Sequence, residues 1–281
     1  RLTFFPCQKN TKHHFNFMIY EIVLRLGIFL LIFLLLLGLE YAFPRRKRVQ
    51  KRVGRWIANG SLSLINTLGL RLVNLMIPFA ASVAAYDASV NGVGLFNYFS
   101  IHLWIEIFVS IIMLDFVIWC QHWVTHKIPF LWSFHRVHHA DRDMDVTTAI
   151  RFHPFEIFLS MLIKIGAVYV LGPAVFAVIL FEIILNATAI FNHANLAIPK
   201  PVDKVLRWVV VTPDMHRIHH SRERKEHDTN FGFALSVWDR IFKTYKNDPI
   251  GGQSEMQVGL DWQDDNPANL TWALLLPFSK K

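Results

Sequence analysis

Residues 101–126 read IHLWIEIFVSIIMLDFVIWCQHWVTH, an apolar stretch that ends in two histidines. A helix needs roughly 20 apolar residues to cross a bilayer, and residues 101–124 supply them. His122 and His126 are four residues apart, so a helix places them on the same face. The stretch therefore predicts a membrane helix that carries two neighbouring imidazoles at one end.

Further apolar segments cover residues 22–42, 61–85 and 155–192, and Gly172-Pro173 divides the last one into a helical hairpin. Hydrophobic residues make up 53% of the 281 residues, far above the usual composition of a soluble domain. We expect an all-α integral membrane protein with four to five transmembrane helices. A cytoplasmic helical cap should carry a histidine-rich site for two metals.

The distribution of positive charge predicts the orientation of these helices. Seven cations follow the first apolar segment: Arg45, Arg46, Lys47, Arg48, Lys51, Arg52 and Arg55. The stretch from Tyr86 to Ser100 contains neither Lys nor Arg. By the positive-inside rule the basic run lies in the cytoplasm and residues 86–100 lie on the opposite side. Counting segments then places all the histidine clusters on the cytoplasmic face. Because topology accounts for the net charge of +8, no nucleic-acid partner is expected.

Both ends of the chain carry further expectations. Residues 1–17 are polar and without periodicity, so we expect a non-native or disordered leader, followed by a single membrane domain over residues 18–281. The run from Ile22 to Leu39 is too long for a signal-peptide core and indicates a membrane anchor. Leu270 to Phe278 is apolar and predicts a short helix resting on the membrane surface.

Nine histidines stand just beyond the apolar runs. Besides His122 and His126 they form His135-x2-His138-His139, His216-x2-His219-His220 and the isolated His193. Neutral imidazole is the commonest side-chain ligand of transition metals, and helical spacing turns each cluster toward one side. Nine ligands exceed the four of a usual zinc site, so two metals are expected.

Several other chemistries lack their motifs. His122-Trp-Val-Thr-His126 lacks the glutamate of the H-E-x-x-H zinc proteases. Neither a G-x-S-x-G elbow, a phosphate-binding glycine loop nor a dinucleotide fingerprint is present. A membrane zinc hydrolase stays open as an alternative. A metal-binding or transport protein is disfavoured, because its ionisable residues would lie deep within the spans rather than at their ends.

The succession of motifs resembles a known superfamily. It contains Asp115-x6-His122-x3-His126, Trp132-x2-His135-x2-His138-His139, Arg151-x-His153-Pro154-x-Glu156 and Asn192-His193-Ala194-Asn195. Residues 212–221 (TPDMHRIHHS), 228–232 (DTNFG) and 238–242 (WDRIF) follow. Over residues 18–278 the chain is similar to the sterol desaturase and fatty acid hydroxylase superfamily. Lys243 stands where that pattern has glycine, and Asn192 and Asn195 flank His193, where other members often have a further histidine.

This resemblance implies a membrane-bound non-haem di-iron oxidoreductase that uses O2 to hydroxylate or desaturate a lipid, such as a sterol or fatty acyl chain. Its metal ligands would be His122, His126, His135, His138, His139, His193, His216, His219 and His220. Two iron ions, O2 as co-substrate and an external electron donor are implied, with a cytochrome- or ferredoxin-type protein as redox partner. The resemblance does not decide the lipid, the choice between alcohol and alkene, or the oligomeric state.

Residues around the metals carry further expectations. Imidazole ligands usually donate their second N–H to an acceptor, and Asp115, seven residues before His122 in an apolar run, is the first candidate. Glu156, Asp214 and Asp239 follow it. The aromatic residues Trp119, Trp123, Trp132, Phe134 and Trp208 fit an interfacial belt better than the lining of a hydrocarbon channel. The basic run can bind anionic headgroups or an acidic electron-transfer protein, although topology is its stronger explanation.

Overall fold

The computed structural model describes residues 11–76, 80–99, 101–262 and 266–279. In this part of the chain the regular structure is helical, with three isolated β-bridges, as expected for an all-α protein. The long helices are α1 (Thr11–Ala42), α2 (Arg52–Met76), α5 (Leu103–Lys127), α7 (Pro154–Leu171) and α8 (Val175–His193). The shorter ones are α3 (Ala81–Asn91), α4 (Leu95–Tyr98), α6 (Pro129–His139), α9 (Lys200–Leu206), α10 (Pro213–His219), α11 (Arg224–His227), α12 (Val237–Ile241) and α13 (Leu270–Leu275), with 3-10 turns η1 (Thr148–Ile150), η2 (Asn266–Ala268) and η3 (Leu276–Phe278).

Within the described residues, four helical segments are long and apolar enough to cross a membrane: Tyr20–Ala42, α5, α7 and α8. They correspond to three of the four segments expected from hydropathy. The expected span over residues 61–85 is wrong, because α2 ends at Met76 and a separate helix, α3, begins at Ala81. Residues 77–79 between them lie outside the described part. Arg71 and several small polar residues make α2 less apolar than the four spans.

The hairpin expected at Gly172-Pro173 is present. Gly172 ends α7 in the left-handed conformation (φ 65°), and its amide donates to the carbonyl of Val168 at 2.7 Å. A Cβ atom at this position would lie 2.6 Å from both Asn97 Nδ2 and the Val93 carbonyl. Only glycine therefore lets the hairpin turn pack so closely against the segment before α4.

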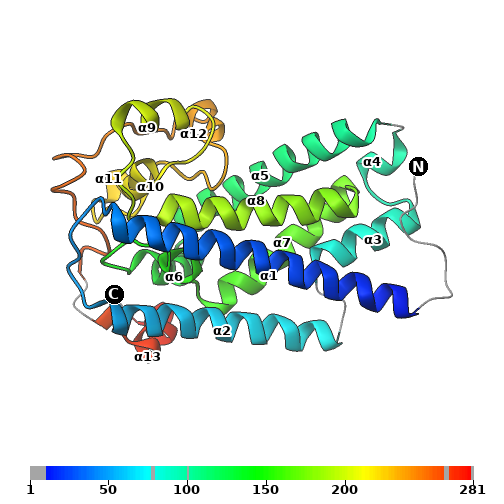
Figure 1. The fold of residues 1–281 in the computed structure, drawn as a ribbon, viewed down its shortest axis with the longest axis horizontal. Helices are drawn as coiled ribbons and strands as arrows, with labels where there is room; N and C mark the ends of the chain where they lie inside the picture. Colours follow the sequence, from blue (N-terminus) through cyan, green and yellow to red (C-terminus); the bar gives the residue numbers. More distant parts are fainter. Residues whose placement is uncertain (1–10, 77–79, 100, 263–265, 280–281) are drawn as a thin grey trace.

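The long helices lie side by side, with the short helices gathered at the two ends of the bundle (Figure 1). A cap of α6 and α9–α12 covers one end, whereas α3 and α4 lie at the other. An apolar core around Ala85, Leu114 and Phe181 joins α3, α5 and α8 away from the cap. Within the spans, Glu182 of α8 receives hydrogen bonds from Arg25 of α1 and, at 2.7 Å, from Lys164 of α7. These contacts fix the bundle that supports the cap.

The two chain ends differ from expectation. We expected residues 1–17 to be a non-native or disordered leader. α1 begins at Thr11, so residues 11–17 are helical, and residues 1–10 lie outside the described part. The short helix expected near the C-terminus is present as α13. Its Ala273 is buried in a second core with Leu62 of α2 and Val137 of α6. It packs against the base of the cap instead of only resting on a membrane.

Candidate metal centre

Four helices of different length carry the nine histidines to the cap end of the bundle. His122 and His126 lie in the last turns of α5, and His193 is the last residue of α8. The second and third clusters lie on α6 and at the end of α10. Pro129 begins α6 and Pro213 begins α10, each at a position where a missing N–H costs nothing. Every one of the nine side chains is at most 5% exposed.

The structure sorts the nine histidines into two groups. The first contains His122, His126, His135, His139 and His219. The second contains His138, His193, His216 and His220. Within each group, one ring nitrogen of every member lies within 4.8 Å of the others. The groups do not follow the sequence clusters, because adjacent residues such as His138 and His139 point about 100° apart around a helix. Each sequence cluster on α6 and α10 thus contributes to both groups.

Five of the imidazoles are oriented through Nδ1. Four hydrogen bonds go to main-chain carbonyls and one goes to a carboxylate: His122 to Phe231 O (2.7 Å), His138 to Arg151 O (3.2 Å), His193 to Ala189 O (2.7 Å), His219 to Thr229 O (2.8 Å) and His135 to Glu156 Oε1 (2.6 Å). A carbonyl can only accept, so Nδ1 carries the proton. Nε2 then presents its lone pair to the centre of the group, which is the form that binds a metal.

The Nε2 atoms face one another at short range. His122 Nε2 lies 3.0 Å from His135 Nε2, and His193 Nε2 lies 3.0 Å from His138 Nε2. Neither nitrogen of these pairs has a proton to share, so the two lone pairs repel each other unless a cation lies between them. Two nitrogens bound to one metal at about 2.1 Å and at right angles are about 3.0 Å apart. The spacing therefore fits a shared metal ion in each group.

Buried ring nitrogens point to the same conclusion. Among the described residues, both ring nitrogens of His139 and of His220 are buried without a hydrogen-bond partner. Leaving a buried polar group unsatisfied costs about 1–3 kcal/mol, which metal coordination would remove. Burial, and secondarily the neighbouring imidazoles, hold the pKa of His139 and of His220 well below the ordinary value. These side chains are thus neutral, as metal ligands must be.

The carboxylates expected to support the ligands take different places. Glu156 contacts His135 directly, as described above. Asp115, our first candidate, instead accepts hydrogen bonds from Trp238 Nε1 at 2.8 Å and from the Leu235 amide at 3.3 Å. Asp214 pairs with Arg45 and Arg217. Asp115 and Asp214 therefore position the protein segments of the cap and not an imidazole.

Asp239 supports a ligand through the main chain. Its carboxylate accepts from the amides of Phe231 (2.8 Å) and Gly232 (2.9 Å), from Trp119 Nε1 (3.1 Å) and from Thr244 Oγ1 (2.7 Å). Phe231 is the residue whose carbonyl accepts from His122. Burial raises the pKa of Asp239, whereas the hydrogen bonds donated to it act in the opposite direction. The Asp239 carboxylate thus holds the segment at Phe231 and Gly232, and the Phe231 carbonyl orients His122.

Sequence reasoning missed two residues beside the first group. His227 stacks on Trp132 with ring centres 5.1 Å apart. Together with His126 and Asp228 it forms a third, partly exposed set of possible ligands. Asp228 Oδ1 lies 3.5 Å from His126 Nδ1. In the sequence, these two residues stand seven and eight positions after His220. This spacing does not indicate that they lie next to His126 of α5.

The five aromatic residues divide into two kinds. Trp119 is buried and stacks on Phe242 at 4.5 Å, and Phe134 is buried and stacks on Phe155 at 4.2 Å. Trp132 lies against His126 with ring centres 4.8 Å apart. Trp123 and Trp208 are exposed, as a belt at the membrane interface requires. Trp119 and Phe134 are therefore core residues, and Trp132 packs against the first histidine group.

Comparison with known proteins agrees with this site. Residues 107–244 match the family model described as fatty acid hydroxylase, a range that contains all nine histidines. The chain is 25% identical over 234 residues to the ornithine lipid hydroxylase of Rhizobium tropici, which covers 78% of this chain and 66% of that protein. It is 28% identical over 148 residues to human alkylglycerol monooxygenase, covering 51% of this chain and 30% of the relative. A fatty acid hydroxylase of Lecanicillium is 27% identical, over 66% of this chain and 52% of that protein. No solved structure matches the chain.

Proposed function

We propose that this chain, whose residues 107–244 belong to the fatty acid hydroxylase family, hydroxylates a membrane lipid with O2 at a pair of iron ions held by its histidines. The observation that carries the proposal is the pair of all-histidine groups with lone pairs that face one another. The three relatives named above are two hydroxylases and a monooxygenase, which favours an alcohol over an alkene as the product.

Each group of histidines would hold one of the two metal ions. The five histidines of the first group and the four of the second would each hold one ion, and Glu156 and the main-chain carbonyls keep Nδ1 protonated so that Nε2 stays available. When bound, two iron ions supply the electrons and the oxygen activation that attack on an unactivated C–H bond requires. Because the nine side chains are buried, the protein excludes bulk water from the reacting lipid.

The reaction determines what else must reach the site. Hydroxylation converts a C–H bond, O2, two electrons and two protons into a C–OH group and water. The sequence carries no dinucleotide fingerprint, so an external protein of the cytochrome or ferredoxin class would deliver the electrons. The basic run after α1 lies at the cap end of the bundle, and by the positive-inside rule this end faces the cytoplasm, where such donors occur.

The deciding experiment is turnover with 18O2 in membranes that contain the protein. Lipid extracts should show a product heavier by one 18O atom than its substrate, and the protein purified from the same membranes should contain close to two metal ions per chain. His138→Ala and His219→Ala should each abolish the product and remove at least one ion, whereas His102→Ala, an exposed residue at the far end of α5, should do neither. Full activity with zinc alone or without O2 would overturn the oxygenase and favour the zinc hydrolase.

A further inference from the structure

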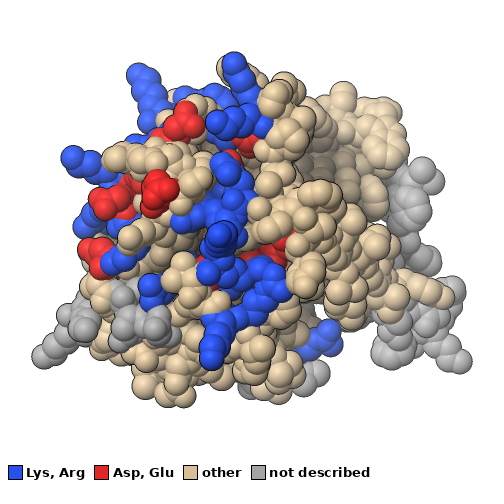
Figure 2. Space-filling view, turned by 60° about the vertical axis from the view of Figure 1, so that its left-hand side comes forward, with Lys and Arg blue, Asp and Glu red and all other residues tan. Residues whose placement is uncertain are grey.

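A cationic cavity lies beside the second histidine group. Its lining includes Arg46 and Lys47 from the loop after α1, Arg142 from the segment after α6, Arg217 of α10, and the polar residues Asp143 and Asn195. Four of these side chains are cations and one is a carboxylate. Figure 2 shows Lys and Arg gathered in a band over this end of the molecule, next to a largely uncharged surface. The cavity is small, so it accepts one small group rather than a whole headgroup.

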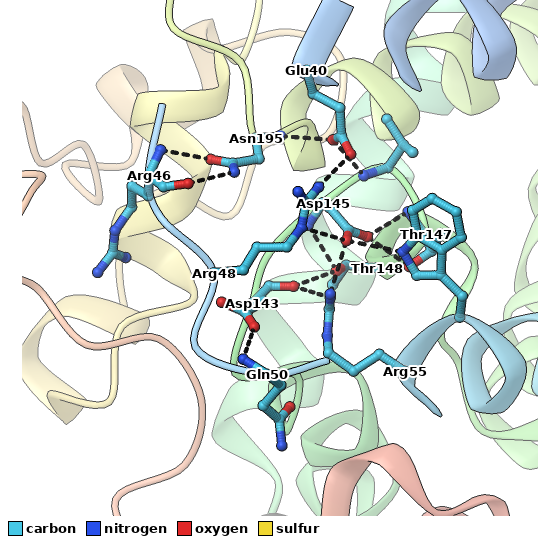
Figure 3. Close-up of polar contacts among 12 residues, drawn as sticks. Glu40, Arg46, Arg48, Gln50, Arg55, Asp143, Asp145, Thr147, Thr148 and Asn195 are labelled. Carbon is cyan, nitrogen blue, oxygen red and sulfur yellow. Dashed lines mark hydrogen bonds and ion pairs between the residues drawn. The ribbon is translucent and has the colours of Figure 1, made fainter. Parts of the chain in front are cut away.

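The loop that supplies Arg46 and Lys47 is held in place by its main chain. Asn195 pairs with both the amide (3.0 Å) and the carbonyl (2.9 Å) of Arg46. Asp143 accepts from the amides of Val49 at 2.8 Å and Gln50 at 2.6 Å. Figure 3 shows the contacts of Asn195 with Arg46 and of Asp143 with Gln50, and it shows that the Arg46 side chain extends away from Asn195. The main chain of this loop is therefore fixed, and Arg46 and Lys47 extend from a defined position.

Two of the carboxylates nearby are already engaged, and the Arg46 guanidinium donates to the Met256 carbonyl. The Asp143 carboxylate serves the loop amides, and Asp214 pairs with Arg45 and with the buried Arg217. Burial lowers the pKa of Arg46 and the neighbouring charge of Arg45 lowers it further, although Asp143, Asp214 and Glu255 act in the opposite direction. With Arg45, the four cations of the lining still outnumber these three carboxylates. The cavity thus has an excess of positive charge, which an anion would offset. Arginine and phosphate form the strongest charge-assisted hydrogen bonds of this kind.

The position of the cavity identifies the source of the anion. The α1 span ends at Ala42 and the α8 span ends at His193, so residues 46 and 195 lie just beyond the ends of two spans. This is the depth of lipid headgroups. We infer that the cavity binds the phosphate of an anionic membrane lipid, beside the metal centre. Topology alone explains cations on this side of the membrane, but it requires neither a cavity nor a loop clamped by Asn195 and Asp143.

The test compares the full chain, purified in a neutral detergent, with two short-chain lipids. Dihexanoyl phosphatidylglycerol should bind at least about ten-fold more tightly than dihexanoyl phosphatidylcholine, whose phosphate is paired with its own cation. Arg46→Gln combined with Arg142→Gln should abolish this preference, whereas the double Lys variant R46K/R142K should keep most of it. Lys51→Gln, which removes an exposed charge of the same basic run outside the cavity, should behave as wild type.

The remaining arms separate the other outcomes. Metal content and unfolding temperature check that each variant is folded, and Arg142→Gln alone replaces the double variant if that one does not accumulate. Inorganic phosphate that competes as strongly as the glycerol lipid would overturn the lipid assignment and leave a free-anion site. Equal binding of both lipids by wild type, or a preference that survives R46Q/R142Q, would overturn the site. The test measures lipid binding and needs no turnover. The assignment of the lipid site can therefore be tested even if the chain is not a hydroxylase.

Discussion

Each imidazole of the centre uses its two ring nitrogens for different purposes. For His122, His138, His193 and His219 the acceptor at Nδ1 is a main-chain carbonyl, which no side-chain substitution removes. His135 alone among these five donates to a carboxylate, that of Glu156. Glu156 follows His153 and Pro154 in the first turn of α7, so the start of a membrane helix fixes its position. It is therefore the acceptor that a single substitution can test.

Glu156→Gln should weaken metal binding by about ten-fold to a hundred-fold, because the partner of a ligating histidine sets its orientation and basicity. The measurement is metal content after competition with a chelator, combined with the unfolding temperature. Asp115→Asn is the matched control, since Asn keeps an oxygen for Trp238 and the hydrogen bonds of Asp115 described above do not go to an imidazole. A larger loss of metal from the Asp115 variant than from the Glu156 variant would contradict this assignment.

Residue spacing predicted which histidines would meet but not how they would be shared. The i, i+3 and i+4 intervals identified eight of the nine histidines in the two groups, and His193 was identified by its position just beyond an apolar run. They did not show that His138 and His139 would join different groups, because that depends on where α5, α8 and α10 lie around α6. Asp115 was preferred over Glu156 because it shares the α5 face of His122. Its carboxylate is instead engaged by Trp238, a contact between residues 123 positions apart.

At the scale of elements, α12 holds the segment around Phe231, whose carbonyl orients His122 of α5. Asp239 of α12 fixes the amides of Phe231 and Gly232, and a Cβ atom at Gly232 would lie 2.8 Å from the Leu235 carbonyl and 3.0 Å from Asp239 Oδ2. The close approach leaves no room for a side chain. The short cap helices thus act on the metal centre through main-chain geometry.

Asp239→Asn should lower the free energy of unfolding by about 2 kcal/mol, because the amide NH2 of Asn would face buried N–H donors. It should also lower metal affinity, since the Phe231 carbonyl would move from His122. Thermal unfolding and metal competition measure the two effects. Asp248→Asn, an exposed position in the same region, serves as the control. Unchanged stability and metal content in the Asp239 variant would show that the segment is held by other contacts.

Hydropathy predicted elements where apolar residues and helix breakers coincide. Gly172-Pro173 marked the hairpin because the left-handed Gly172 ends α7 where the sequence indicated. The segment 61–85 failed because a hydropathy window averages across the end of α2 and the start of α3. One face of α2 packs against the rest of the protein through polar residues. Asn66, for example, donates to the Phe152 carbonyl at 2.9 Å.

At the scale of the molecule, the basic loop and the metal centre lie at the same end. We predict that this end faces the cytoplasm and that α3 lies on the other side. Lys51→Cys and Lys225→Cys, both exposed, should react with a membrane-impermeant maleimide only after the cells are opened, whereas Asn91→Cys should react in intact cells. The reasoning is the cation bias around the spans. Labelling of positions 91 and 225 from the same side would rule out this topology.

We predict that the bundle and the cap depend on bound metal to different degrees. The core around Leu114 and Phe181 is made of apolar side chains and includes no histidine, so the spans should persist without metal. The cap is joined to α5 and α8 through histidines of α6 and α10, and without metal their neutral, buried lone pairs repel each other. Metal removal should therefore open the cap while leaving the spans intact.

Limited trypsin digestion with and without a strong chelator tests this division. With metal bound, cleavage should stay at exposed residues such as Lys225. After chelation, new cuts should occur at Arg136 and Arg217, which are buried in the cap, but none at Lys164 inside α7. Restoring the metal should restore protection, which separates this effect from irreversible unfolding. An unchanged cleavage pattern would mean that the core of Leu62, Val137 and Ala273 holds the cap by itself, because the apolar contacts of that core do not depend on metal.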